Sequence, residues 1–351
     1  MIDLSGRQTV GNSSFQTPPM GLGCVFLGDP DGPTDEDRMQ QTLAAAWDGG
    51  VRYFDTAPWY GNTKSEHRLG HFLRQKPRDD FLISTKVGRV YCRPDDPASF
   101  HNSPWMARWK GGLPFDLRFD YTGDGVKRSY EDSLTRLGLT GVDALAIHDL
   151  DLKHHKTRDN VTRYLDQLSH EGGYRALKDL KDSGEIKAIG VGINHTGMIP
   201  AFLERFEIDY FLVAMPYTLL DQPALEEDFK LCEQAGSNVI IGAVFASGIL
   251  ATGSSNPAIY GYNPPTDEVI ERVRQMEAAC TTHGVALAAA ALQFPLAHPL
   301  VTSVIPGADT PARVRQNLGN MAAPIPAAFW RELRDQGLVD ATAPLPGDER
   351  L

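Results

Sequence analysis

Residues 51–70 read VRYFDTAPWYGNTKSEHRLG, and this stretch decides the fold. Its first residues, 51–54, form a short run rich in β-branched and aromatic side chains, which predicts a strand. Pro58 and Gly61 then force a tight loop, and a helix is expected to begin near Ser65. The stretch is therefore a strand, a loop and a helix, with polar residues between the two regular elements.

Two residues of this stretch lie at the place where an α/β barrel holds its chemistry. Asp55 ends the predicted strand, and Tyr60 follows it on the loop. In such a barrel the loops after the strands gather on one face, and the strands beneath keep them rigid. Taken alone, the pair is better explained as a helix-capping Asp and a packing Tyr, so the rest of the chain has to decide.

The alternation of strand and helix repeats along the chain. Strands are predicted at 20–27, 51–54, 81–87, 142–148, 186–193, 210–215, 239–245 and 302–305. Helices are predicted at 35–47, from 65, and at 126–137, 164–183, 199–206, 224–235, 267–283, 285–296, 310–321 and 327–336. No glycine-rich dinucleotide fingerprint follows a strand, because Gly190 and Gly192 lack a third glycine. The order predicts a single (β/α)8 TIM barrel over residues 1–351, with extra C-terminal helices.

Two segments depart from the alternation. Residues 1–19 are polar and turn-rich, and Gly6 and Gly11 are spaced like the tips of a hairpin, which we expect to plug one barrel end. Residues 88–125 are irregular and rich in Pro, Asp and aromatic side chains. Loops of this length in a compact domain are usually functional or disordered, and the aromatic side chains favour function, so this segment is expected to form the substrate loop.

Composition and charge restrict the class of protein. The 351 residues carry a net charge of -11, which argues against nucleic acid or an anionic membrane as a partner. The four cysteines show no C-x-x-C spacing, so neither a disulfide framework nor a metal site is predicted. The sequence has no apolar leader and no window of about eighteen apolar residues, which predicts a cytoplasmic protein. We expect a small-molecule substrate and a monomer or homo-oligomer.

Four polar residues fall at the carboxyl ends of predicted strands: Asp55, Lys86, His148 and Asn194. A buried Lys is rare unless it is paired, and the expected partner of Lys86 is Asp55. An ammonium group beside Tyr60 would lower the pKa of the phenol and prepare it for general acid–base catalysis. His148 would then hydrogen-bond and orient the substrate oxygen.

Three motifs carry a resemblance to a known family. They are FDTAPWYG at 54–61 with the following Ser65 and Glu66, STKVG at 84–88, and AIHD at 146–149. The chain resembles an aldo-keto reductase over residues 21–317. The resemblance implies a (β/α)8 barrel that moves a hydride between a nicotinamide cofactor and a carbonyl or alcohol. It also assigns the catalytic tetrad, which is Asp55, Tyr60, Lys86 and His148.

Within the family, the loops are most similar to those of the D-threo-aldose 1-dehydrogenase (L-fucose dehydrogenase) branch. L-galactose dehydrogenases and pyridoxal 4-dehydrogenase-like enzymes are related to that branch. The segments that suggest it are YTLLD at 217–221, VFASGILA at 244–251 and ALQFPLAHP at 291–299.

The resemblance also implies cofactor contacts. Asn194 corresponds to the residue that binds the nicotinamide carboxamide, and Phe245 to an aromatic residue that stacks on the nicotinamide ring. Ala214 stands where many relatives have a Gln that binds the same carboxamide, so Asn194 is expected to hold it alone. An ordinary turn remains an alternative explanation of Ser247 and Gly248. The other implied contacts are Ser247, Gly248, Leu250, Gly307, Arg313, Gln316 and Asn317.

The choice between NAD and NADP rests on two residues with opposite implications. NADP-dependent members usually carry a basic residue directly after the Ile-Pro of the last strand. Here Gly307, Ala308 and Asp309 follow, and a carboxylate would repel a 2′-phosphate. Arg313, however, stands where the family often keeps a phosphate-binding Arg. The cofactor is NAD or NADP, and Asp309 favours NAD.

For the substrate, Trp59, Trp105 and Trp109 are expected to wall the pocket. Aromatic faces suit a sugar ring, but they suit pyridoxal equally, or they simply pack the loop. The resemblance favours an aldose 1-dehydrogenase in which Tyr60, as phenolate, removes the proton of the anomeric hydroxyl while hydride leaves C1 of an aldose such as L-fucose, giving the lactone. The alternatives are an NADPH-dependent reductase of a sugar-derived aldehyde or pyridoxal, and a cofactor-binding regulatory subunit.

Overall fold

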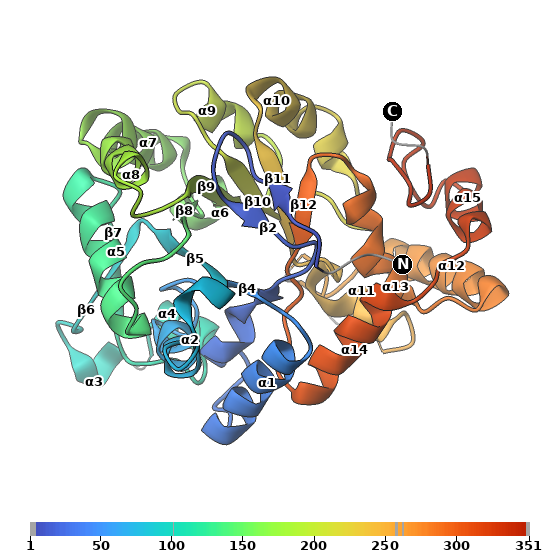
Figure 1. Ribbon diagram of the computed structural model, residues 1–351, viewed down its shortest axis with the longest axis horizontal. Coiled ribbons are helices and arrows are strands. Elements are labelled where there is room, and N and C mark those ends of the chain that lie inside the picture. The colour runs from blue at the N-terminus through green and yellow to red at the C-terminus, as the bar shows by residue number, and fades with distance from the viewer. Residues whose placement is uncertain (1–4, 101, 257–258, 262, 349–351) are drawn as a thin grey trace.

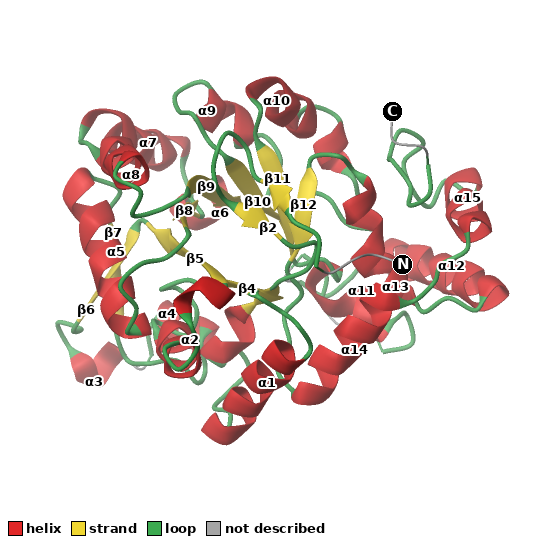
Figure 2. Ribbon diagram, viewed as in Figure 1, coloured by secondary structure: helices red, strands yellow, loops and turns green. Residues whose placement is uncertain are grey.

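Parallel strands curl into one sheet, and helices pack around it (Figure 1 and Figure 2). The structure is a computed structural model, and it describes residues 5–100, 102–256, 259–261 and 263–348. The eight-stranded sheet has the order β3 (Leu22–Gly23), β4 (Tyr53–Asp55), β5 (Leu82–Val87), β8 (Ala144–His148), β9 (Ala188–Ile193), β10 (Tyr210–Ala214), β11 (Asn238–Gly242) and β12 (Val301–Val304). Parallel bridges join Met20 to Val304 and Gly23 to Gly307, so the first and last strands meet. The predicted (β/α)8 barrel is confirmed.

The first strand is shorter than predicted. Strand β3 covers only Leu22–Gly23, with a single bridge before it at Met20, and Cys24–Gly28 forms the 3-10 helix η1. At Gly28 the backbone crosses the loop of the 51–70 stretch so closely that a Cβ atom would lie 2.5 Å from the nitrogen of Gly61. Ser65 Oγ also donates a hydrogen bond of 2.8 Å to the carbonyl of Cys24. The chain therefore turns early because the two loops pack against each other.

Helices cover the outside of the barrel and bury their apolar residues on it. The long ones are α1 (Glu36–Asp48), α2 (Lys64–Leu73), α5 (Gly123–Leu137), α7 (Arg158–His170), α8 (Gly173–Asp182), α10 (Asp228–Ala235), α12 (Asp267–His283), α14 (Pro311–Ala322) and α15 (Ala327–Asp335). Short helices among them are α6 (Leu152–His155), α9 (Ile199–Leu203), α11 (Ile249–Thr252) and α13 (Leu287–Gln293).

No single helix of the described residues is long and apolar enough to cross a membrane. Helix α12 and residues Leu287–Ala297 meet that test only as a pair, and the pair is bent by 100°.

One predicted helix is interrupted. The run 164–183 was expected to be continuous, but α7 ends at His170 and α8 begins at Gly173. A Cβ atom at Gly173 would lie 1.9 Å from the carbonyl oxygen of Tyr121, and Gly172 has a φ of 82°. The break lets the backbone pass this close to the segment that enters α5, a contact that the local sequence pattern does not show.

The N-terminal segment forms the expected hairpin. Strands β1 (Gln8–Thr9) and β2 (Gln16–Thr17) pair antiparallel, and in Figure 1 this blue segment crosses the barrel. Its Phe15 packs with ring centroids 5.8 Å from Tyr53 and 6.2 Å from Tyr210. These tyrosines begin β4 and β10, so the hairpin lies at the amino end of the barrel and leaves the carboxyl end open for the site.

The 88–125 segment is more regular than predicted. Strands β6 (Arg89–Cys92) and β7 (Asp116–Phe119) form an antiparallel ribbon, and the short helices α3 (Pro97–Phe100) and α4 (Pro104–Arg108) lie between them. Alternate residues of the ribbon bury apolar side chains with Trp59 and Trp109. The segment is thus a folded insertion packed on the carboxyl end of the barrel.

Candidate active site

The four tetrad residues meet at the carboxyl end of the barrel. Lys86 Nζ lies 2.7 Å from Asp55 Oδ2 and 3.2 Å from the Tyr60 hydroxyl oxygen, and it donates a third hydrogen bond of 2.7 Å to the carbonyl of Thr56. The ring of His148 lies 6.0 Å from that of Tyr60, at 86° to it. The expected ion pair is therefore present, and the ammonium group has three acceptors.

Strand geometry explains why these side chains converge. Asp55 pairs in parallel register with Ser84, and Lys86 follows two residues later on the same face of β5. Ser84 Oγ donates a 2.8 Å hydrogen bond to Asp55 Oδ1 and lies 3.0 Å from the Tyr53 hydroxyl. Sequence reasoning missed Ser84, although its position two residues before Lys86 places it beside the tetrad.

Lys86 acts on the pKa of Tyr60 in the expected direction, but the predicted net decrease towards neutrality is wrong. Burial raises the pKa of Tyr60 to about 12, because Lys86 opposes burial only in part and the carboxylate of Asp55 adds to the increase. Burial alone would lower the pKa of Lys86, but Asp55 raises it above its usual range and keeps the amine charged. Tyr60 is therefore protonated near neutral pH and is ready to donate a proton.

His148 ends β8 and faces a carboxylate that the sequence reasoning did not single out. Its Nε2 lies 3.2 Å from Asp149 Oδ2. Burial holds the pKa of His148 well below its usual range, so the imidazole is neutral. Asp149 also accepts hydrogen bonds from Asn194 Nδ2 at 2.8 Å and from Arg89 Nη2 at 3.0 Å. The signal that could have found Asp149 is its place directly after His148 at a strand end.

The loop after β11 carries the first group of expected cofactor contacts. Phe245 is half-buried, and the next three residues, Ala246, Ser247 and Gly248, have φ values of 49°, 63° and 116°. This run of left-handed residues curls the backbone tightly, and the N–H groups of Ala246 and Gly248 donate to the carbonyls of Ala243 and Phe245 at 2.7 Å and 2.9 Å. The N–H of Leu250 bonds to the carbonyl of Phe245 at 3.2 Å and its side chain is buried, so Leu250 shapes the loop.

The start of α14 carries the second group. Asn317 Nδ2 lies 3.5 Å from the carbonyl of Gly307, whereas Gln316 is exposed. A Cβ atom at Gly307 would lie 2.8 Å from the ring of Phe26, which explains the glycine. Arg313 Nε lies 3.2 Å from Asp309 Oδ1, so the two residues with opposite implications for the cofactor are paired with each other.

These residues fit a nicotinamide dinucleotide. The Asn194 amide reaches the carboxylate that also contacts His148, which places an amide beside the tetrad where the nicotinamide is required. The N-terminus of the twelve-residue helix α14 brings a positive dipole end that suits a phosphate group, whereas the N–H groups of Ala246 and Gly248 already donate to the carbonyls of Ala243 and Phe245. The arrangement matches an amide at one end of the cofactor and a phosphate group further along.

Comparison with known proteins identifies the family. A model of the aldo/keto reductase family matches residues 19–336.

The chain belongs to the aldo/keto reductase family.

It is 38% identical to pyridoxal 4-dehydrogenase of Microbacterium luteolum, over 96% of this chain and 99% of the relative. It is 36% identical to D-threo-aldose 1-dehydrogenase of a Pseudomonas species, over 92% and 94%. Among solved structures, the holo form of aldo-keto reductase AKR11C1 from Bacillus halodurans superposes with a TM-score of 0.72 at 23% identity, covering 98% of this chain and 99% of that one. The latter likeness concerns the fold alone. The family resemblance of the motifs is confirmed, and the chain is an NAD(P)-dependent oxidoreductase that acts on alcohol or aldehyde groups.

In this aldo/keto reductase the folded insertion brings aromatic rings to the tetrad. Trp109 is fully buried, with its ring 5.5 Å from Trp59 and 6.0 Å from Tyr60. Trp59 and Trp109 thus pack on each other, and Trp109 also packs beside Tyr60. Trp105 lies on α4, and its side chain is outside the described part of the structure.

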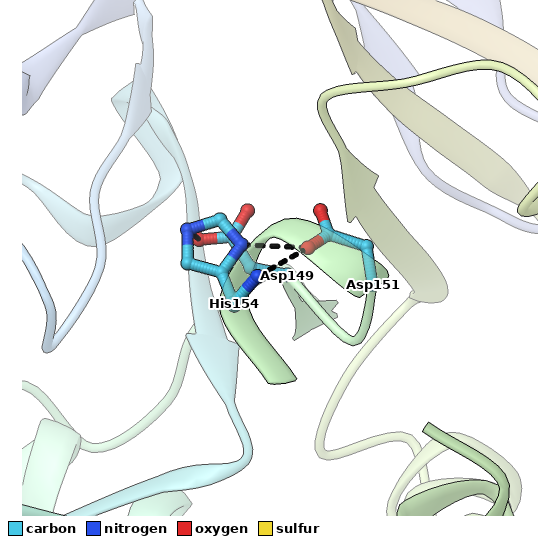
Figure 3. A group of neighbouring side chains, drawn as sticks. All are labelled: Asp149, Asp151 and His154. Carbon is cyan, nitrogen blue, oxygen red and sulfur yellow. Dashed lines mark hydrogen bonds and ion pairs between the residues drawn. The ribbon is translucent and has the colours of Figure 1, made fainter. Parts of the chain in front are cut away.

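An acidic cluster borders the tetrad of the reductase. Figure 3 shows Asp149, Asp151 and His154, whose ligand-type atoms lie within 4.8 Å of one another. His154 Nδ1 lies 2.8 Å from Asp151 Oδ1, and its Nε2 lies 3.4 Å from Asp149 Oδ2. Asp151 also caps α6 by accepting from the backbone N–H of His154. Only Asp151 Oδ1 is hydrogen-bonded to His154, and the buried Oδ2 of Asp151 has no hydrogen-bond partner within the described residues.

Proposed function

We propose that this enzyme oxidises the anomeric carbon of an aldose such as L-fucose to the lactone. The observation that carries the proposal is the tetrad itself, with Lys86 Nζ 3.2 Å from the Tyr60 hydroxyl and 2.7 Å from Asp55. The relatives support the substrate class, because D-threo-aldose 1-dehydrogenase is 36% identical and L-galactose dehydrogenase of Arabidopsis thaliana is 28% identical over 89% of this chain.

The roles of the residues follow from their contacts. The cofactor, when bound, accepts the hydride that leaves C1. The proton of the anomeric hydroxyl passes to the phenolate form of Tyr60, which Lys86 stabilises by charge and by its hydrogen bond. Nε2 of the neutral His148 lies 3.2 Å from the Asp149 carboxylate, whose charge favours a proton on that nitrogen and leaves Nδ1 as an acceptor for a substrate hydroxyl. Trp59 offers an aromatic face beside these groups.

Pyridoxal is a second candidate substrate, favoured by the 38% identity to pyridoxal 4-dehydrogenase. In water pyridoxal closes to a cyclic hemiacetal between its aldehyde and a neighbouring hydroxymethyl group. The carbon to be oxidised then carries one hydrogen, one hydroxyl and one ring oxygen, as C1 of a cyclic aldose does. The same proton acceptor and the same hydride transfer would give a lactone from either molecule.

We further propose NAD as the preferred cofactor. Supporting this choice, Asp309 pairs with Arg313 and with Arg38, whose Nε donates a 3.0 Å hydrogen bond to the Asp309 carbonyl. A 2′-phosphate would approach the Asp309 carboxylate and would have to compete with it for Arg313. A free 2′-hydroxyl meets no such repulsion.

Initial rates of reduced-nicotinamide formation test these proposals. Purified protein is supplied with L-fucose, D-arabinose, L-galactose or pyridoxal, and with NAD or NADP in parallel. We expect turnover of at least one aldose with NAD, and a loss of about 10²- to 10⁴-fold in Tyr60→Phe, which removes the proton-transfer group. Turnover of pyridoxal alone would select the second candidate, and the absence of turnover with every hemiacetal would refute the proposal.

A further inference from the structure

The carboxylate of Asp149 joins parts of the site that come from different elements. Its Oδ1 accepts a hydrogen bond of 2.8 Å from Asn194, which follows β9. Its Oδ2 lies 3.0 Å from Nη2 of Arg89 on β6 and 3.2 Å from Nε2 of His148 on β8. The Asp149 residue is only 7% exposed. One buried carboxylate thus contacts the residue expected to bind the carboxamide and the residue expected to bind the substrate oxygen.

We propose that Asp149 is a positioning residue that fixes the His148 ring and the Asn194 amide together, so that the substrate side and the cofactor side of the site are aligned by one group. This inference rests on the proposed function for its catalytic consequence. Its structural part concerns only how this chain prepares Asn194 to bind a nicotinamide dinucleotide.

The contact with Asp149 determines which end of the Asn194 amide faces it. A carboxylate only accepts hydrogen bonds, so the NH2 group of Asn194 faces Asp149 and the amide oxygen lies on the other side of the group. An amide oxygen is the partner that the NH2 group of a nicotinamide carboxamide needs. Ala214 at the end of β10 has no side-chain group that could hydrogen-bond the carboxamide. Binding of the carboxamide therefore depends more strongly on the orientation of Asn194.

The same carboxylate selects the tautomer of His148. A neutral imidazole has one N–H group, and a neighbouring carboxylate favours the tautomer that carries it on the nearer nitrogen. Nε2 lies 3.2 Å from Asp149 Oδ2, so the negative charge favours a proton on Nε2, and the buried Nδ1, which has no hydrogen-bond partner within the described residues, remains an acceptor. Without the carboxylate the two tautomers would compete, and part of the protein would present N–H where the lone pair is needed.

Arg89 holds the carboxylate in place. Its guanidinium carbon lies 5.1 Å from the ring centroid of Trp59 and 5.4 Å from that of Phe119, so aromatic rings flank the cation. Asp149 itself has a φ of 48°, and its N–H donates a 3.1 Å hydrogen bond to the carbonyl of Gly192. The backbone conformation and the ion pair together direct the carboxylate towards His148 and Asn194.

The chain offers a matched control at the other end of β8. Asp143 precedes this strand as Asp149 follows it, and it is 2% exposed. Its carboxylate lies 2.8 Å from Arg78 Nη2 and 2.8 Å from Lys187 Nζ, and it accepts the N–H of Ile83. Asp143→Asn therefore removes a buried, Arg-paired carboxylate next to the same strand, without changing a tetrad residue or Asn194.

The test compares Asp149→Asn with Asp143→Asn by titrating NADH into the protein without substrate, and by steady-state kinetics. We expect Asp149→Asn to weaken NADH binding about tenfold or more and to lower kcat about a hundredfold, with a smaller change in the KM of the aldose. Asp143→Asn should lower the melting temperature but keep NADH binding and kcat within about twofold, since it lies outside the site.

The inference is overturned if Asp149→Asn binds NADH as tightly as wild type, or if Asp143→Asn shows the same losses. Should Asp149→Asn not fold, because Arg89 is left as an unpaired buried charge, the double variant Arg89→Met/Asp149→Asn removes both charges and is measured against the same expectations. Wild-type protein that oxidises no hemiacetal would refute the proposed function alone, because the NADH titration needs no substrate.

Discussion

The ammonium group of Lys86 lies 2.7 Å from the carboxylate of Asp55, and each of these side chains is only 1% exposed. Moving two charges out of water is costly unless their geometry is good and their remaining hydrogen-bonding groups are satisfied. Here Ser84 donates to the second oxygen of Asp55, and Lys86 donates to Thr56 and Tyr60. The remaining hydrogen-bonding groups of the buried pair are therefore satisfied, and its cation lies beside the Tyr60 hydroxyl.

Asp55→Asn should destabilise the protein as well as inactivate it. The change leaves the Lys86 ammonium buried without its counter-charge, which typically costs about 3–5 kcal/mol of unfolding free energy. Urea unfolding followed by circular dichroism measures this loss. The control is Asp179→Asn, which breaks the exposed pair with Arg175 on α8 and should cost less than about 1 kcal/mol. Equal losses in the two variants would contradict the importance of the buried pair.

Ser84→Ala tests the residue that orients Asp55. We expect a loss of about 1–2 kcal/mol in stability from the missing hydrogen bond, and a decrease of roughly ten- to a hundredfold in kcat because Asp55 is no longer held by two donors. Thr85→Val is the matched control, because Thr85 points to the opposite face and donates a 2.6 Å hydrogen bond to Glu66. It should lose similar stability and keep its activity. A normal kcat in Ser84→Ala would show that Lys86 alone suffices to hold Asp55.

Much of the fold and the core of the site could be predicted, because both depend on local signals. Buried parallel strands are nearly continuous apolar runs, so a charged residue such as Lys86 within one is conspicuous. Strand ends are marked by a change to polar residues, and parallel strands bring these ends to one edge. Asp55 and His148 could therefore be placed at one mouth although 93 residues separate them, by their numbers in the chain.

The features that could not be predicted depend on contacts between distant segments. The residues around Gly173 give no sign that the chain passes close to Tyr121, where a Cβ atom on Gly173 would lie 1.9 Å from the Tyr121 carbonyl oxygen. The sequence pattern therefore does not predict the break between α7 and α8. The ion pair of Arg89 with Asp149 joins residues 60 positions apart. The sequence predicts the wrong direction for the pKa of Tyr60, because it indicates the neighbouring cation but not how deeply the phenol is buried.

The pKa of Tyr60 predicts the pH dependence of the two reaction directions. Because burial raises this pKa to about 12, the phenolate is a minor form throughout the ordinary range and its fraction increases tenfold with each pH unit below 12. Oxidation needs the phenolate, so kcat/KM for aldose oxidation should increase by up to about tenfold per unit between pH 7 and pH 10. Reduction of an aldehyde needs the protonated form and should stay level over the same range. Initial rates in both directions measure this, and a flat oxidation profile would contradict a proton acceptor with a raised pKa at this position.

Asp309→Asn should shift the cofactor preference towards NADP. The substitution removes the carboxylate that pairs with Arg313 at 3.2 Å and with Arg38 at 3.5 Å, so both guanidinium groups become available to a 2′-phosphate and no anion remains to repel it. Asp309, Arg313 and Arg38 are partly exposed, so removing one charge at contact distance changes the binding free energy by only about 1 kcal/mol. This corresponds to an increase of roughly five- to tenfold in the ratio of kcat/KM for NADP to that for NAD.

The control for this prediction is Asp179→Asn, which removes the same charge far from α14 and should leave the ratio unchanged. If the ratio does not move in Asp309→Asn, then Arg313 does not face the ribose of the adenosine, and the preference is determined by other residues. If NAD turnover falls while NADP turnover stays constant, Asp309 acts instead by accepting a hydrogen bond from the ribose hydroxyl, which the separate kcat/KM values for the two cofactors distinguish.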